Sequence, residues 1–152
     1  MSAAQVEAGA VHGIDRLLRN IETGRFERML SGLTAGAALV NGLEIFLEHD
    51  RASFGNRWMW APIALTPPMI AAGVVGVAWR RAAKTVLPIV SAFVLANGIQ
   101  GTYLHARGIL RRPGGLSEAV YNVETGPPPF APLLMGMVGG MGLLAAILRR
   151  ER

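Results

Sequence analysis

Residues 39–51 read LVNGLEIFLEHDR, and residues 95–107 read LANGIQGTYLHAR, which is a similar sequence 56 positions later. Each copy closes a long apolar run. The matched polar positions are Asn41 with Asn97, Glu44 with Gln100, His49 with His105, and Arg51 with Arg107. Because the order and spacing of these residue types repeat, we interpret the two stretches as copies of one structural unit.

A second correspondence supports this interpretation. Residues 60–63 read WAPI and residues 130–133 read FAPL, and each of these motifs opens the next apolar run. The two runs end alike, at a pair of arginines. The sequence therefore predicts a duplicated two-helix unit, with one copy at about residues 29–81 and the other at about residues 85–150.

The apolar runs are long enough to cross a membrane. Of the 152 residues 51% are hydrophobic and only 16% are charged, and the charges are concentrated between apolar windows. A helix needs roughly 20 mainly apolar residues to span about 30 Å of hydrocarbon. Four windows meet this requirement, at residues 29–48, 59–79, 85–104 and 130–148. We predict an all-α polytopic membrane protein, with four transmembrane helices arranged as two tandem hairpins in residues 29–152.

Residues 1–28 have a different pattern. Apolar side chains recur there at helical spacing, and arginines and other polar residues lie between them. Acidic residues are mixed in and no apolar core is present, so the segment is not a cleavable signal peptide. The pattern predicts a cytoplasmic amphipathic helix on the membrane surface, its arginines near anionic headgroups.

The distribution of basic residues predicts the orientation. Ten of the fifteen lie before the first span, between spans two and three, or after span four, whereas five lie in the other two loops. The positive-inside rule therefore places both termini in the cytoplasm. Fourteen of the fifteen are arginine, as is common in GC-rich bacteria, so we expect the plasma (inner) membrane of a bacterium.

Several functions are excluded by composition. The chain has no cysteine, which excludes disulfides, thiolate nucleophiles and cysteine-ligated metals. A net charge of +5 would suggest nucleic-acid binding in a soluble protein, but these arginines flank apolar spans and we expect no nucleic acid. Gly32 and Gly36 form a GxxxG spacing, which predicts close packing of helices and not phosphate binding. Pro67 and Pro68 are expected to kink the second span.

The duplicated motif predicts a polar site near the outer face. Two hairpins that enter from the same side are parallel repeats, so their matched residues should lie at matched depths. A carboxylate inside a span costs about 2–3 kcal/mol and normally faces the bundle. The candidate site residues are Glu44, Glu48, His49, Gln100, His105 and Arg107, with Asn41 and Asn97 as interhelical polar contacts. Gln100, His105 and Arg107 are candidate partners of Glu44.

Four functions are compatible with this site. In the first, the polar residues are structural, and the protein is a non-catalytic accessory or scaffold subunit of a larger membrane complex or a homo-oligomer. In the second, His49 and His105 ligate one b-type haem, and the protein transfers electrons.

The other two functions use the carboxylates. A transition-metal site could be built from Glu44, Glu48, His49 and His105, although the second copy lacks matching carboxylates. A small proton-coupled transporter could use Glu44, as in small multidrug exporters. No catalytic triad or nucleotide fingerprint is present, so an enzyme is the less favoured class.

Overall fold

The computed structural model describes residues 12–13, 15, 18–19 and 23–149. In these residues all regular secondary structure is helical. The elements are α2 (Arg25–Arg51), η1 (Arg57–Met59), α3 (Trp60–Ala78), α4 (Arg80–Lys84), α5 (Val86–Leu110), η2 (Gly115–Glu118), α6 (Ala119–Thr125) and α7 (Phe130–Leu148).

Four of these helical segments are long and apolar enough to cross a membrane, as the sequence predicts. Their apolar parts coincide with the four expected windows, and α7 has the same bounds as the fourth. α2 and α5 continue beyond the ends of their windows, and the polar residues that follow each window form the last turns of the helix. The chain is therefore an all-helical membrane protein.

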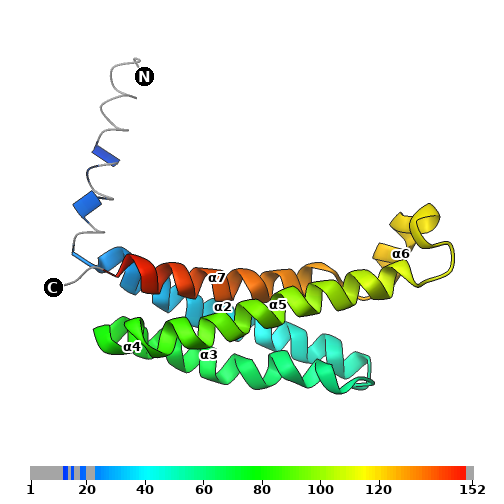
Figure 1. Cartoon of the computed structure of the whole chain (residues 1–152), viewed down its shortest axis with the longest axis horizontal. Coiled ribbons are helices and arrows are strands. Elements are labelled where there is room, and N and C mark those ends of the chain that lie inside the picture. The colour runs from blue at the N-terminus through cyan, green and yellow to red at the C-terminus, as the bar shows by residue number, and fades with distance from the viewer. Residues whose placement is uncertain (1–11, 14, 16–17, 20–22, 150–152) are drawn as a thin grey trace, which may run out of the picture.

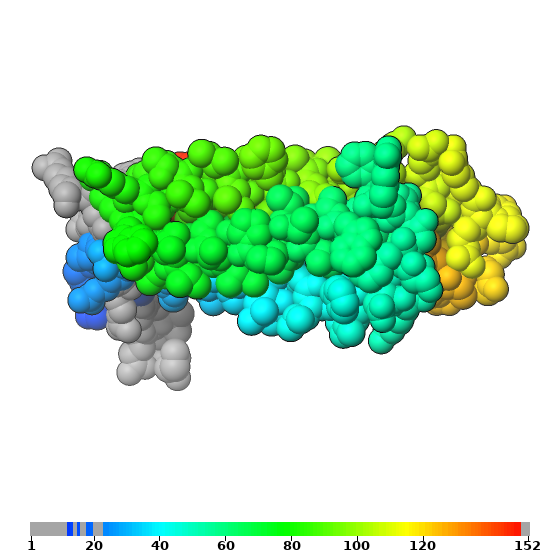
Figure 2. All heavy atoms as spheres, turned by 90° about the horizontal axis from the view of Figure 1, so that it is seen from below, coloured from blue at the N-terminus to red at the C-terminus, as the bar shows by residue number. Residues whose placement is uncertain are grey.

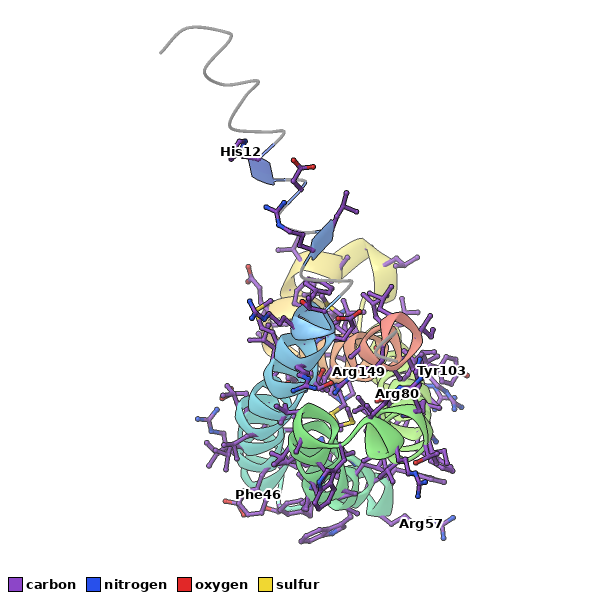
Figure 3. The ribbon with its side chains drawn as sticks, turned by 90° about the vertical axis from the view of Figure 1, so that its left-hand side faces the viewer. His12, Phe46, Arg57, Arg80, Tyr103 and Arg149 are labelled. Atoms are coloured by element: carbon purple, nitrogen blue, oxygen red, sulfur yellow. The ribbon has the colours of Figure 1, made fainter. Side chains whose placement is uncertain are left out.

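The four long helices form one elongated bundle (Figure 1). α2 packs on α3 and α7, and α5 packs on α3 and α7. α2 and α5 consequently lie across one diagonal of the bundle and α3 and α7 across the other, as the end-on view shows (Figure 3). We call the end that carries η1 and α6 the loop end, and the opposite end, where α2 begins and α7 finishes, the terminal end.

Glycines set the closest approach of the helices within each sequential pair. A Cβ atom on Gly42 would lie 2.3 Å from the Thr66 side chain, so α2 and α3 are in direct contact there. A Cβ atom on Gly98 would lie 2.3 Å from the backbone nitrogen of Gly136, so α5 and α7 touch backbone to backbone. In a lipid solvent such close packing supplies much of the attraction between helices.

The GxxxG spacing of α2 is not used in the same way. A Cβ atom on Gly36 would have no atom within 4 Å, and one on Gly32 would reach only the Val77 side chain at 3.6 Å. Gly73 of α3 makes the close contact with α2 instead, against Ala35. Within the bundle, Gly36 therefore makes no close helix contact and Gly32 makes only an ordinary one, so the predicted close packing through this spacing is not seen between the helices of this chain.

At the terminal end, charged groups are buried between the helices. The Arg149 side chain is 1% exposed and donates from its guanidinium to the Gly76 carbonyl at 2.7 Å, and it points between the helices in Figure 3. Lys84, which is exposed, donates from Nζ to the Ala146 carbonyl at 2.7 Å. Glu27 is fully buried, and its carboxylate oxygens have no hydrogen-bond partner in the described part of the chain.

Two further sequence predictions concern the N-terminal segment and the two prolines of the second span. The amphipathic helix expected in residues 1–28 falls largely outside the described residues, and α2 already begins at Arg25. α3 is one helix that includes both Pro67 and Pro68. The loop between α5 and α7 contains η2 and α6, and it extends beyond the α2–α3 turn at the loop end (Figure 2).

Candidate functional site: a cavity at the loop end

A cavity of about 480 Å³ lies at the loop end and is lined by all four long helices. Its volume falls in the range of small-molecule sites, about 300–1,000 Å³. Its walls are mainly apolar, with a few polar groups. The polar lining residues are Glu48, His49, Arg51, Asn56, Asn97, Gln100 and His105, and the apolar ones include Ile45, Trp58, Met59, Leu104, Pro128, Pro132 and Met135.

His49 is fixed by the turn that joins α2 to α3. Its Nδ1 donates to the Met59 carbonyl at 2.8 Å, one residue before α3 begins. The Phe54 amide donates to the His49 carbonyl at 2.9 Å, which closes the turn around the histidine. Asn56 accepts from the Trp58 amide at 3.0 Å and caps η1. The imidazole therefore has a defined position at the cavity wall.

The same turn is strained, and an aromatic cluster stabilises it. Ser53 and Phe54 have φ values of 53° and 46°, which cost on the order of 1 kcal/mol or more each for residues other than glycine. The Phe54 ring stacks on Trp60 with centroids 4.1 Å apart, and its edge meets His49 at 6.1 Å. The stacking and partial burial of the Phe54 ring offset the strain, and the same ring contacts the His49 imidazole.

His105 has an equivalent position in the second helix pair. Its Nδ1 donates to the Pro128 carbonyl at 2.7 Å, two residues before α7 begins. The loop between α5 and α7 is fixed by its own bonds. Arg112 donates to the carbonyl and the hydroxyl of Thr125, both at 2.9 Å, and the Asn122 amide donates to the Pro113 and Gly115 carbonyls.

The two histidines share a tautomer. A carbonyl oxygen can only accept, so Nδ1 carries the proton in both rings, and Nε2 of each neutral ring keeps its lone pair. Neither Nε2 has a hydrogen-bond partner in the part of the chain that the structure describes. Both rings line the same cavity, from helices on opposite sides of the bundle. In their neutral forms the two rings therefore place two imidazole nitrogens with free lone pairs beside the cavity.

The structure brings some of the other predicted site residues to this cavity. Glu48 lines the wall and forms an ion pair with Arg51, which lines it too. Asn97 and Gln100 of α5 also line it. Asn41 is buried and donates from Nδ2 to the Met135 sulfur at 3.6 Å, which is an interhelical contact with α7 and not with Asn97. Within the described residues Asn97 makes no side-chain hydrogen bond.

Glu44 and Arg107 do not take part. Both side chains are exposed, and neither lines the cavity. Glu44 has no ion pair or hydrogen bond in the described part of the chain, so its expected contacts with Gln100, His105 and Arg107 are not formed. The expectation that this carboxylate faces the bundle is wrong, because α2 turns position 44 outward.

The residues do not form the predicted carboxylate–histidine metal site. Among the described residues no three His, Cys, Asp or Glu side chains gather in a way that could hold a metal ion. Glu44 points away, and Glu48 is neutralised by Arg51. The cavity offers two histidine nitrogens as ligands, which is sufficient only for a metal whose other ligands come from a cofactor.

Sequence reasoning missed the groups that hold the histidines. The Met59 and Pro128 carbonyls carry no side-chain signal, Asn56 stands in the α2–α3 turn, and Asn122 stands in the short helix α6. One signal was available: each histidine is followed by an aromatic-Ala-Pro motif that starts the next span, and both carbonyls lie just before it. Comparisons with protein-family models, with curated proteins and with solved structures found no match to this chain.

Proposed function

We propose that the protein is a small integral-membrane subunit that binds one b-type haem in the loop-end cavity, with His49 and His105 as the axial ligands. One observation carries this proposal. Two imidazoles line a single cavity from opposite sides of the bundle, and each is held through Nδ1 by a backbone carbonyl. Ligating histidines have this second interaction almost always, because it fixes the ring and makes Nε2 a stronger donor to the metal.

Haem fits the site better than a bare ion does. A bare zinc or iron site needs three or more protein ligands, and the described residues offer two at the cavity. Haem supplies four nitrogens of its own and requires only axial ligands from the protein. The cavity is mainly apolar, as a porphyrin requires, and Arg51 at its wall is a cation that could meet a propionate.

Two axial histidines limit the chemistry of the iron. Both imidazoles would be occupied in holding the group, which suits a site for carrying electrons and not for catalysis. Bound haem would supply one-electron redox chemistry, and with His49 and His105 both used to hold it, we expect the site to pass electrons from a reduced partner protein to an oxidised one. The protein is thus a non-enzymatic subunit of a larger membrane complex, and the catalytic centres belong to its partners.

The tandem repeat and the orientation are part of this proposal. Gly42 contacts Thr66 and Gly98 contacts Gly136, and these pairs occupy corresponding positions in the two proposed copies. The histidine-to-carbonyl bonds also correspond, to within one residue. These matches support parallel hairpins. The arginine distribution supports cytoplasmic termini in a bacterial plasma membrane, which places the cavity near the outer face.

Transport through Glu44 receives no such support. A coupling carboxylate has to face the substrate pathway, whereas Glu44 lies on the outside of the bundle, away from the cavity. An accessory role without a cofactor would use only the Nδ1 bonds of the two imidazoles and leave both Nε2 atoms at the cavity unused. Haem binding is the function that uses the geometry of the site.

Haem titration of the purified full-length protein tests the proposal. We expect a Soret band that saturates at about one haem per chain, and His49→Ala and His105→Ala should each weaken binding at least tenfold. His12→Ala is the matched control, because His12 is exposed and lies outside the bundle (Figure 3). The proposal fails if the protein binds no haem, or if all three variants bind it equally.

A further inference from the structure

One face of α2 points out of the bundle and is not covered by the described chain. We call it the outward face of α2, and it consists of Leu33, Gly36, Val40, Leu43, Glu44 and Leu47. These positions fall on one stripe of the helix at its 3.6-residue period. Val40 is 70% exposed and Leu43 is 58% exposed, so the stripe contacts whatever surrounds the protein.

Lipid suits the apolar members of this face, but it does not suit Glu44. The residue lies seven positions before Arg51, which is about 10 Å along the helix axis. The charged Glu48 stands one turn further on and is paired with Arg51. Leu43 and Leu47 beside Glu44 are apolar, so Glu44 is a charge at the edge of the apolar zone. An ionised group there is expensive and normally pairs with another charged or polar group. The described residues provide no such group for Glu44.

Gly36 adds a second, independent feature. A Cβ atom there would meet nothing within 4 Å, whereas Gly42 and Gly73 are in tight contact inside the bundle. Gly36 therefore leaves a notch on the outward face, about 12 Å along the axis from Glu44. Small residues on a lipid-facing surface allow another helix to come close. The face combines a place for close approach with a charge that needs a counter-charge.

We infer that the outward face of α2 docks a transmembrane helix of another protein that carries a lysine or arginine at the depth of Glu44. Charge complementarity decides between the occupants. A second copy docked through the same face would bring two Glu44 carboxylates together. Arg51 continues the same stripe, but it lies about 10 Å further along the axis and is already paired with Glu48. Lipid chains offer no counter-charge. A basic partner helix satisfies the carboxylate and fills the notch at Gly36.

A synthetic helix tests this inference. The full-length protein, labelled with a donor fluorophore, is placed in lipid nanodiscs with an acceptor-labelled polyleucine helix that has a single lysine, and the lysine is moved along the helix. We expect energy transfer to peak at one lysine depth, with binding at least tenfold tighter than that of the lysine-free helix. A helix with glutamate at that depth should bind no better than the lysine-free one.

Three variants make the test specific. Glu44→Gln should reduce binding to the level of the lysine-free helix, whereas Glu124→Gln, which lies on α6, should leave it unchanged. Gly36→Leu should block docking, whereas Gly140→Leu on α7, where added atoms also meet open space, should not. Equal binding at every lysine depth, an unaffected Glu44→Gln variant, or energy transfer between two copies of the protein instead would each overturn the inference. None of these outcomes depends on haem, so the two proposals can fail separately.

Discussion

Replacing Gly98 by alanine should loosen the bundle and weaken the site at the same time. Gly98 lies where α5 meets α7, and an added Cβ would be 2.3 Å from the Gly136 nitrogen and 2.9 Å from the Pro132 carbonyl. Both neighbours are backbone atoms, so rotation of a side chain cannot relieve the contact. The helices have to separate by about 1.1 Å to reach 3.4 Å, the shortest ordinary contact.

The magnitude follows from two opposing effects. Overpacking of this kind costs about 1–3 kcal/mol, and the backbone contact places Gly98→Ala at the upper end of that range. Alanine gains at most about 1 kcal/mol of helix propensity over glycine. We expect a net loss of about 2 kcal/mol. Because Pro132 lines the cavity, the displaced α7 should also weaken haem binding several-fold.

Unfolding by denaturing detergent, followed by tryptophan fluorescence, measures the first effect, and haem titration measures the second. Gly36→Ala is the matched control, since it also adds one methyl group to a glycine in a spanning helix but meets open space. It should leave the free energy of unfolding unchanged or slightly raised. If Gly98→Ala were as stable as Gly36→Ala, the account of the α5–α7 contact would be refuted.

Three further predictions concern the stability of the α5–α7 loop, the pH dependence of haem binding and the orientation of the protein in the membrane. Asn122→Ala removes two hydrogen bonds to the Pro113 and Gly115 carbonyls. It should destabilise the loop by about 1–3 kcal/mol and speed amide hydrogen exchange there. Ser117→Ala on the loop surface should have little effect. Acidification should release haem, because protons compete for the Nε2 lone pairs of the two histidines, and a haem affinity that rises as the pH falls would contradict axial ligation. In intact cells an impermeant maleimide should label Ser117→Cys at the loop end but not Thr85→Cys at the terminal end, and the reverse pattern would overturn the predicted orientation.

The helices could be predicted because hydropathy alone defines them. A window of about twenty apolar residues has few alternatives to a spanning helix, and the four windows coincide with the apolar parts of the observed helices. The similarity of residues 39–51 and 95–107 predicts both histidines at one site, and they line one cavity in the structure. The hydrogen bonds that fix the two histidines could not be predicted, since their acceptors are backbone carbonyls, which every residue type has.

The orientation of Glu44 shows where the pattern was too coarse. Asn41, Glu44 and Glu48 fall within about 60° of one another, which suggests one common face. The buried arc of α2 is defined by Ala38, Asn41, Gly42 and Ile45, and it extends about 100° to one side of Asn41. His49 lies inside that arc, whereas Glu44 lies about 60° beyond its other edge. Only the contacts with α3 and α7 reveal which side of Asn41 is buried.

Electron paramagnetic resonance of the ferric, haem-loaded protein tests the central claim most directly. Two axial imidazoles make the iron six-coordinate and low-spin, so the wild-type protein should give a low-spin signal. His49→Ala and His105→Ala should each convert the iron to a five-coordinate, high-spin form. A high-spin signal from the wild-type protein, or a low-spin signal that persists in both variants, would contradict ligation by this pair of histidines.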